Sequence, residues 1–389
     1  MGLIPKSILR SRWLDAIRRI EAGQLTFVEP SGERHVVKGP LEGPVATFQI
    51  HDWDVIDRAV SRGDIGLGED YIAGAWETDS VESLISLFLL NLERFEGYAH
   101  GSIWNRIGFV ILNTVLRRNS LRGSRKNIEA HYDVGNSFYS LWLDETMTYS
   151  SALYEREQAR LEEAQKSKYQ RILNRIGPDK ARVLEIGCGW GGFADIATHR
   201  DYEVTGITVS PSQHAFATER LGGRADVRLE DYRATKGTFD AIVSIEMFEA
   251  VGERYWPQYF QVLSERLKRG GRAVLQVITI RDDLFAGYRT RSDFIRQYVF
   301  PGGMLPSVAG LVREADRAGL KTVDVYGFGQ DYARTLRAWS ERFSAAEDGI
   351  RALGHGDEFV RNWQFYFGIC AAAFAVNRTN VVQVELAHA

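Results

Sequence analysis

Strands that alternate with helices fill the second half of the chain. Short apolar runs bounded by polar or glycine-containing turns predict strands, and segments of helical spacing follow most of them. The predicted strands are residues 183–186, 204–209, 227–229, 241–245 and 273–278. This order is typical of a doubly wound α/β fold with a parallel sheet. We expect residues 326–328 and 365–375 to add antiparallel edge strands, after a helical insertion over residues 283–317 that covers the active site.

The N-terminal part has a different pattern. Residues 25–38 predict a hairpin around a Pro-Ser-Gly-Glu turn, and residues 45–50 predict a further strand. Helical spacing follows at residues 54–62 and 80–90. The glycines of residues 63–68 predict a turn between these helices, because no strand precedes them and no Lys-Ser or Lys-Thr follows as in a phosphate loop.

These patterns divide the chain into three parts. We expect a small α+β domain at residues 1–100, a connector at residues 101–126 and the α/β domain at residues 127–389. The connector is apolar with helical spacing from Ile103 to Leu116 and is then rich in arginine. It predicts either a core helix followed by a solvated linker or an amphipathic segment that faces a membrane.

Composition and charge narrow the functional classes. The chain has 389 residues and a net charge of -3, which gives no reason to expect a nucleic-acid partner. The chain has two cysteines, Cys188 and Cys370, which are too few for a disulfide framework. The histidines show no HxH or HExxH spacing, so we expect no metal site. No apolar run is long enough to cross a bilayer, and the start lacks an apolar signal region, so we expect a cytoplasmic protein.

The segment Val183-Leu-Glu-Ile-Gly-Cys-Gly-Trp-Gly-Gly192 carries the strongest chemical signal. It runs from a predicted strand into glycines that open a helix, so the backbone can approach a nucleotide closely, although a tight turn alone can also require these glycines. A dinucleotide is disfavoured because GxGxxG is incomplete and no acidic residue closes the strand at Thr208. Glu185 before the loop, and Asp231 beside the aromatic Tyr232, favour S-adenosylmethionine, a cationic sulfonium nucleoside.

Several further blocks resemble the cyclopropane fatty acid synthase family, and the resemblance covers nearly the whole chain. The blocks are Asn127-Ile-Glu-Ala-His-Tyr-Asp-Val-Gly-Asn136, Leu143-Asp-Glu-Thr-Met-Thr-Tyr-Ser150, Thr208-Val-Ser-Pro-Ser-Gln213, Phe248-Glu249 and Asp331-Tyr-Ala-Arg-Thr-Leu336. The resemblance implies a Rossmann-like class I methyltransferase domain with a helical lid and a small N-terminal domain. It also implies transfer of a methyl group from S-adenosylmethionine to the double bond of an unsaturated acyl chain on a phospholipid.

By the same resemblance, a set of residues lines the S-adenosylmethionine site. They are Tyr149, Ser150, Gly187, Gly189, Thr208, Gln213, Asp231 and Tyr232, to which Glu185 is added from its position before the loop. Thr208 and Gln213 stand where other methyltransferases use a ribose-binding carboxylate.

Methyl transfer to an alkene leaves a carbocation, and a base must then remove a proton. The resemblance implies that this base is a bicarbonate ion held by a cysteine, a glutamate, a histidine, a backbone group and a tyrosine. Glu249, Ile278 and Tyr332 match the family. Ser151 replaces the cysteine and Gln276 replaces the histidine, and because both can still hydrogen-bond, the ion site can persist.

Glu246 is a further departure, because the family has a glycine at this position. A second carboxylate three residues before Glu249 can raise the pKa of one partner, repel bicarbonate and act as the base itself. A solvated structural carboxylate is the other interpretation. Since the position of the base decides which proton leaves, the product is either a cyclopropane or a methylene- or methyl-branched acyl chain.

Two other functions stay open. A small-molecule N-methyltransferase on the same fold would need a desolvated amine and no lipid surface, and a non-catalytic lipid-binding protein would account for Ser151 and Gln276. The N-terminal domain and the basic cluster from Arg117 to Lys126 favour phospholipid acyl chains at a membrane surface as the partner. We therefore expect a peripheral membrane enzyme, and homodimerisation stays open.

Overall fold

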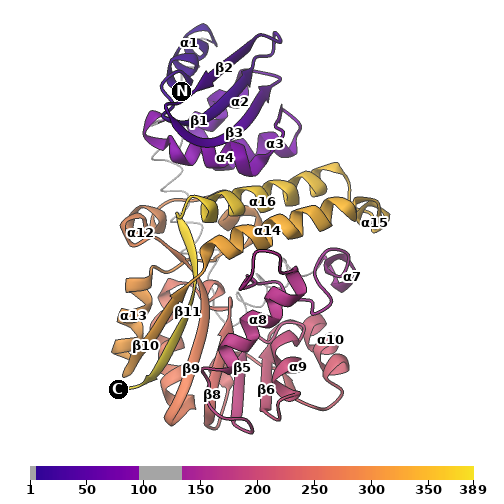
Figure 1. Cartoon of the computed structure of the whole chain (residues 1–389), viewed down its shortest axis with the longest axis vertical. Helices are drawn as coiled ribbons and strands as arrows, with labels where there is room; N and C mark the ends of the chain where they lie inside the picture. Colours follow the sequence, from indigo (N-terminus) through magenta and orange to yellow (C-terminus); the bar gives the residue numbers. More distant parts are fainter. Residues whose placement is uncertain (1–5, 96–133) are drawn as a thin grey trace. The chain divides into compact units, whose positions relative to one another are not determined.

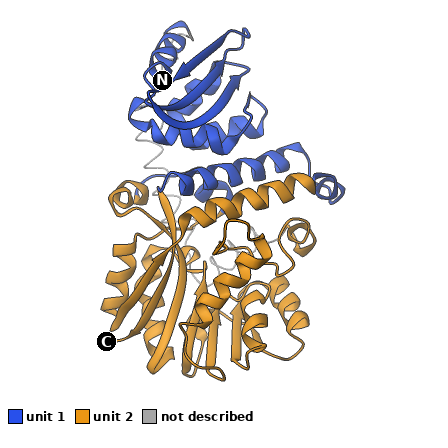
Figure 2. Cartoon of the chain, in the orientation of Figure 1, with its two compact units in different colours: residues 1–112, 290–299, 347–377 blue, residues 113–289, 300–346, 378–389 orange. Residues whose placement is uncertain are grey.

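The computed structural model describes residues 6–95 and 134–389, so the predicted connector lies outside the described residues. The chain forms two compact units, which Figure 2 shows in different colours. The first consists of residues 1–112, 290–299 and 347–377, and the second of residues 113–289, 300–346 and 378–389. The first unit therefore includes two segments that the sequence analysis places in the α/β domain.

A small sheet and the helices beside it form the first unit. Within the described residues the strand order is β2-β1-β3-β4, with β1 antiparallel to β2 and parallel to β3. The strands are β1 (Ala22–Val28), β2 (Arg34–Lys38), β3 (Leu41–Ile50) and β4 (Trp76–Glu77). The helices and helical turns are α1 (Lys6–Ile17), α2 (Asp54–Arg62), α3 (Asp64–Ile72), α4 (Val81–Leu90), η1 (Leu92–Phe95), η6 (Ile295–Val299), α15 (Glu347–Ala352) and α16 (Asp357–Ala375). The hairpin at residues 25–38 and the helices at residues 54–62 and 80–90 are as predicted.

The glycines of residues 63–68 do not form the predicted turn, because all but Gly63 lie in α3. Packing explains this difference. A Cβ atom on Gly68 would lie 2.5 Å from the ring of Phe294 and 2.7 Å from that of Phe365. Glycine is therefore needed here for close contact between α3 and aromatic side chains, which outweighs its low helix propensity.

The second unit contains a larger sheet (Figure 1). Within the described residues its strand order is β10-β11-β9-β8-β5-β6-β7, parallel from β9 to β7 and antiparallel at β10 and β11. The strands are β5 (Arg182–Ile186), β6 (Glu203–Thr208), β7 (Asp226–Leu229), β8 (Phe239–Ile245), β9 (Leu267–Ile280), β10 (Leu320–Gly327) and β11 (Thr379–His388). The helices are α7 (Asn136–Tyr139), α8 (Leu161–Leu173), α9 (Gly192–Thr198), α10 (Pro211–Leu221), α11 (Trp256–Arg266), α12 (Asp282–Arg289), α13 (Val308–Arg317) and α14 (Gly329–Ala345). Short 3-10 turns are η3 (Tyr232–Ala234), η4 (Phe248–Ala250) and η5 (Glu253–Tyr255).

Both faces of this sheet are buried, as the predicted fold requires. Val183 of β5 packs in a core with α8, α9 and α10, whereas its neighbour Leu184 packs in a core with α11 and α13. Successive side chains of a strand point to opposite faces, so one apolar run supplies both cores. The doubly wound α/β class is confirmed.

One of the two predicted edge strands is found at the edge of the sheet, and the other is wrong. Residues 365–375 are not a strand but the second half of α16, a 19-residue helix. The antiparallel strand beside β9 is β11, which the sequence analysis did not predict, and β10 extends the predicted residues 326–328 at the edge. In addition, α13 is not part of a lid, because Leu311 and Ala315 pack in the core of the sheet.

Candidate active site

The loop after β5 has the backbone conformation that its glycines predict. Gly187, Gly189 and Gly191 have φ angles of 82°, 54° and 82°, a region where glycine has no steric cost. A Cβ atom on Gly187 would lie 2.8 Å from Cγ of Met247, whereas a Cβ atom on Gly189 would meet no heavy atom of the described chain within 4 Å. Since β6 and β8 flank β5 on opposite sides, this open backbone lies at the switch point of the sheet.

Thr208 and Gln213 lie together after β6. The hydroxyl of Thr208 donates a hydrogen bond of 3.1 Å to Oε1 of Gln213, and both residues are buried. Ser210 caps α10 by accepting a hydrogen bond from the backbone amide of Gln213. Two neutral polar side chains therefore stand at the carboxyl end of the second strand, where a dinucleotide fold has its acidic residue.

Glu185 is buried near the end of β5. Within the described chain its Oε2 atom has no hydrogen-bond partner. Burial raises the pKa of Glu185 to about 8, although the Ala194 backbone amide and Lys168 act in the opposite direction. Because a buried polar atom without a partner is costly, Glu185 is suited to contact a polar or cationic ligand.

Asp231 and Tyr232 follow β7, but other side chains engage both. The carboxylate of Asp231 forms an ion pair of 2.7 Å with Arg233 and also caps η3. The ring of Tyr232 is buried in the core and lies 5.3 Å from the ring of Tyr259. A contact of this pair with adenine therefore stays a prediction, and it would have to compete with these interactions.

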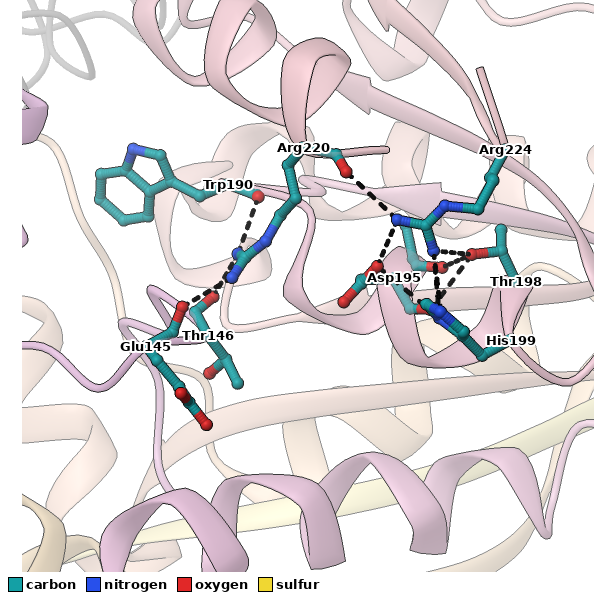
Figure 3. A network of polar contacts seen from close by, with 9 residues as sticks. Glu145, Thr146, Trp190, Asp195, Thr198, His199, Arg220 and Arg224 are labelled. Carbon is teal, nitrogen blue, oxygen red and sulfur yellow. Dashed lines mark hydrogen bonds and ion pairs between the residues drawn. The ribbon is translucent and has the colours of Figure 1, made fainter. Parts of the chain in front are cut away.

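Arg220 of α10 joins the cofactor loop to the segment before Tyr149 (Figure 3). Its guanidinium donates hydrogen bonds to the carbonyl oxygens of Glu145 and Thr146, each at 2.6 Å, and of Trp190 at 3.2 Å. The guanidinium is a planar group with several donors, so it can hold three carbonyl groups in a fixed arrangement. Arg220 thus couples the positions of two segments that the sequence analysis assigned to the cofactor site.

The Tyr149-Ser150 pair faces two different environments. The ring of Tyr149 lies 5.2 Å from that of Trp339 on α14. The hydroxyl of Ser150 accepts a hydrogen bond of 2.7 Å from Nζ of Lys168 on α8, and both residues are buried. The chain at residues 149–150 therefore bridges α14 and α8.

Glu246 lies at the centre of the predicted catalytic residues. One carboxylate oxygen accepts hydrogen bonds from the Ser151 backbone amide at 2.9 Å and from Nε2 of Gln276 at 2.8 Å. The other accepts a bond of 2.6 Å from the hydroxyl of Tyr332. The φ angle of Glu246 is 50°, so a glutamate here keeps a backbone conformation that favours glycine.

Glu249 is the second buried carboxyl group of this cluster. The backbone amide of Ile278 donates to its Oε1, and Oε2 has no hydrogen-bond partner among the described residues. Burial, and next the charge of Glu246, raise the pKa of Glu249 to about 8. Burial also raises the pKa of Glu246, but Lys168 and the donors from Tyr332, Gln276 and Ser151 oppose this effect. Glu246 has three hydrogen-bond donors to its carboxylate and Glu249 has one, so of the two groups Glu246 is the better suited to carry the negative charge.

Lys168 is the buried cation of the site. It is fully buried on α8, and burial lowers its pKa to about 7, against the attraction of Glu246, Asp144 and Glu185. A cation among these carboxylates partly compensates the cost of burying their charge. Lys168 therefore links the cofactor side of the site, through Ser150, with the predicted base.

The structure brings Ser151, Glu246, Gln276 and Tyr332 together in one cluster and places Glu249 with Ile278 beside it. Lys168 and Arg220 are missing from the residues predicted by sequence. A signal for Lys168 existed, since it recurs with Leu161, Gln165 and Ile172 at helical spacing on the buried side of α8. Arg220 offered no such signal, because its hydrogen bonds to the two segments go to backbone carbonyl groups, which any sequence provides.

Comparison with known proteins places this geometry in context. The family described as mycolic acid cyclopropane synthetase matches residues 119–384. A protein of Mycobacterium tuberculosis, "Tuberculostearic acid methyltransferase UfaA1", is 34% identical over 363 residues, which cover 90% of this chain and 84% of the relative. The "Cyclopropane-fatty-acyl-phospholipid synthase" of Escherichia coli K12 is 34% identical over 344 residues, or 87% of each chain.

A solved structure that contains a bound ligand resembles this chain in its fold. It is described as mycolic acid cyclopropane synthase CmaA1 complexed with SAH and CTAB. It covers 67% of this chain and 97% of its own, with 29% identity and a TM-score of 0.63.

Proposed function

The chain belongs to the mycolic acid cyclopropane synthetase family, and we propose that it transfers a methyl group from S-adenosylmethionine to the double bond of an unsaturated fatty acyl chain. The family and its SAH-bound relative make the chain an S-adenosylmethionine-dependent methyltransferase. We further propose that the carboxylate of Glu246 removes the proton that completes the reaction. The observation that carries this second part is the position of Glu246 among Ser151, Gln276 and Tyr332.

The residues around the β5 loop fit the methyl donor. Gly189 leaves the backbone open, Thr208 and Gln213 supply a hydroxyl and an amide, and Glu185 has a buried oxygen with no partner in the described chain. When bound, S-adenosylmethionine supplies an electrophilic methyl group on a cationic sulfur. By the resemblance, the ring of Tyr149, which lies 5.2 Å from that of Trp339, also lines the donor site, and a π face attracts positive charge.

The reaction needs a base that acts once the methyl group has been transferred. The π electrons of the alkene form the new bond to the methyl carbon while the bond from this carbon to sulfur breaks and leaves its electron pair on sulfur, so the positive charge passes to the acyl chain. An adjacent C–H bond then breaks, its electron pair closes a cyclopropane ring or forms a carbon–carbon double bond, and its proton passes to the carboxylate of Glu246. The carboxylate of Glu246 is already held by three donors, so little reorganisation is required during this step.

The hydrogen bonds to Glu246 and Glu249 also affect whether a bicarbonate ion can bind. The residues that the resemblance assigns to the ion are Ser151, Glu249, Gln276, Ile278 and Tyr332. In this chain the donors of Ser151, Gln276 and Tyr332 already bind Glu246, and the amide of Ile278 binds Glu249. A bicarbonate ion would have to displace these bonds and approach a negative charge, so we propose that the chain works without bicarbonate.

We propose phospholipids at a membrane surface as the source of the acyl chain. The Escherichia coli relative is named for a fatty-acyl-phospholipid substrate. The first unit offers exposed apolar side chains at Val36, Leu41 and Val45, and Arg34 and Lys38 flank Val36 on β2. Within the described ranges, no helix is long and apolar enough to cross a bilayer. Surface attachment through a basic and apolar patch would give the enzyme access to its substrate without a membrane-spanning helix.

Incubation of the protein with S-adenosylmethionine labelled in the methyl group and with vesicles of monounsaturated phospholipid tests this function. Mass spectrometry of the released fatty acids should show one added carbon, and NMR then separates a cyclopropane from a methylene or methyl branch. The Glu246→Gln variant should bind SAH as the wild type does but form product at least tenfold more slowly. Absence of label in every acyl chain, from protein that binds SAH, would overturn the proposal.

A further inference from the structure

A chain of hydrogen bonds runs from Arg171 to Glu246. Arg171 on α8 donates to Oε1 of Gln383 at 2.9 Å, and Nε2 of Gln383 donates to Oε1 of Gln276 at 3.0 Å. Nε2 of Gln276 in turn donates to Glu246 at 2.8 Å. Gln276 on β9 and Gln383 on β11 are direct partners in the antiparallel pair, and both are fully buried. This series of hydrogen bonds therefore has a guanidinium at one end and a buried carboxylate at the other.

The donors and acceptors fix the direction of every bond in this chain. A guanidinium has donors only, so Gln383 must turn its carbonyl oxygen towards Arg171 and its NH2 group towards Gln276. Gln276 must then accept with its carbonyl oxygen, which leaves its own NH2 group for Glu246. If the amide of Gln276 were reversed, its oxygen would face the carboxylate and its NH2 group would face that of Gln383. The Gln276 amide is thus fixed from both sides, by Glu246 and the Ser151 carbonyl oxygen at its NH2 group and by Gln383 at its oxygen.

Arg171 is itself held in place. Its guanidinium forms an ion pair of 3.1 Å with Asp324 and lies 4.1 Å above the ring of Tyr326, and both of these residues belong to β10. The side chain of Arg171 is only 15% exposed, whereas that of Asp324 is 36% exposed. The edge strand β10 therefore anchors the start of the chain near the surface, and each amide dipole after it points the same way.

We propose that Gln383 and Arg171 are positioning residues for the base. They orient the amide of Gln276 so that it donates to Glu246 and stabilises the ionised carboxylate. This inference rests on the proposed function, because it assigns Glu246 the role of base. Neither residue contacts Glu246 directly in this chain of bonds, so both act through Gln276.

The Gln383→Leu variant tests the proposal through kcat and its pH dependence. Without the donor from Gln383, the buried carbonyl oxygen of Gln276 loses its hydrogen-bond partner, and its amide is held only by its bonds to Glu246 and to the Ser151 carbonyl oxygen, so its donor to the charged form of Glu246 is less well fixed. We expect kcat to fall about tenfold with KM for S-adenosylmethionine unchanged. The acid limb of the kcat profile should move to higher pH, because the ionised form of Glu246 is less stable. Arg171→Lys keeps a donor for Gln383 and should retain most of kcat, whereas Arg171→Met should resemble Gln383→Leu.

Double variants show whether the effect passes through Gln276. If Gln383 acts through Gln276, the double variant Gln276→Leu/Gln383→Leu should have the same kcat as Gln276→Leu alone. The matched control is Glu385→Gln, two residues along β11, which removes ion pairs with Arg175 and Arg272 and should leave the pH profile unchanged. Gln383→Glu is a second variant that keeps an oxygen acceptor for Arg171 but loses the donor towards Gln276, and it should also lower kcat.

Independent losses in the double variant, or a Gln383→Leu profile that coincides with that of the wild type, would overturn this inference while the proposed function stands. SAH binding by calorimetry provides a separate readout, and every variant should bind SAH as the wild type does. A wild type that binds SAH but transfers no methyl group would contradict the proposed function instead.

Discussion

The hydroxyl of Tyr332 donates a hydrogen bond of 2.6 Å to Oε2 of Glu246. By the resemblance described above, Tyr332 matches the family and Glu246 replaces a glycine, and the backbone of Glu246 has a positive φ of 50°. A non-glycine residue in this conformation costs about 1 kcal/mol. Three hydrogen bonds to the carboxylate and the nearby Lys168 offset this cost, which indicates that the carboxyl group, rather than the backbone, is the feature that matters at this position.

Replacement of Lys168 should lower both stability and activity. Lys168→Met removes the buried cation near Glu246, Asp144 and Glu185, and we expect the free energy of unfolding to fall by about 3 kcal/mol, as when one partner of a buried ion pair is lost. Urea denaturation measures this change. Lys166→Met, on the same helix but with an exposed side chain, is the control and should change stability by less than about 0.5 kcal/mol. Equal effects of the two substitutions would contradict the role assigned to Lys168.

The stability of the protein should depend on Glu249 in a defined pH range. The pKa of Glu249 is about 8 in the folded chain and about 4.3 in the unfolded chain. At a pH between these two values, Glu249 is protonated in the folded state and ionised in the unfolded state. Stability conferred by the neutral carboxyl is therefore lost as the pH rises from about 5 to about 8. Glu249→Gln, which cannot ionise, should make the decline of the unfolding free energy with pH less steep.

Denaturation curves at several pH values check this prediction. Glu219→Gln changes an exposed glutamate of α10 and should leave the slope as it is in the wild type. An unchanged slope in Glu249→Gln would show that Glu249 is already ionised in the folded protein at neutral pH.

Much of the fold follows from sequence because its signals are local. The strands β5, β6 and β8 are short, mostly apolar runs between turns, and the alternation of strands and helices gives the sheet its parallel core. Residues 365–375 were predicted as a strand but form a helix, because an apolar segment without alternation suits a buried helix as well as a buried strand. β11 was missed, although most of its residues are buried, because it lies between two strands that come earlier in the chain.

The site could be predicted only in part from sequence. Motif positions supplied Glu246, Gln276 and Tyr332, but the distances between them depend on β8, β9 and α14, which meet only in the folded chain. Gln383 carries no sequence signal, because its importance lies in its register opposite Gln276. Contacts across a sheet depend on this register, which the local pattern does not specify for an unpredicted strand.

Arg220 should control binding of S-adenosylmethionine rather than the chemical step. Arg220→Met removes the bonds to Glu145, Thr146 and Trp190 that join the two cofactor segments (Figure 3). We expect the dissociation constant for S-adenosylmethionine to rise about tenfold, with kcat at saturation nearly unchanged. Isothermal titration calorimetry measures the binding.

Arg224 provides a matched control for this experiment. It lies four residues further along, pairs with Asp195 at 2.7 Å and donates to the backbone carbonyl oxygen of Arg220, and Figure 3 draws no bond from it to Glu145, Thr146 or Trp190. Arg224→Met should leave the dissociation constant within about twofold of the wild type. Weaker binding in both variants would indicate a general loss of structure rather than a specific link between the two segments.

The dependence of the reaction on bicarbonate tests the assignment of Glu246 as the base most directly. Methyl transfer is measured in buffer freed of carbon dioxide, with and without added bicarbonate, for the wild type and for Glu246→Gly, which restores the glycine of the family and suits the positive φ angle. We predict that the wild type has the same rate in both buffers, and that Glu246→Gly is at least tenfold slower without bicarbonate and recovers when bicarbonate is added. A wild type that requires bicarbonate, or a Glu246→Gly variant as active as the wild type without it, would contradict the account.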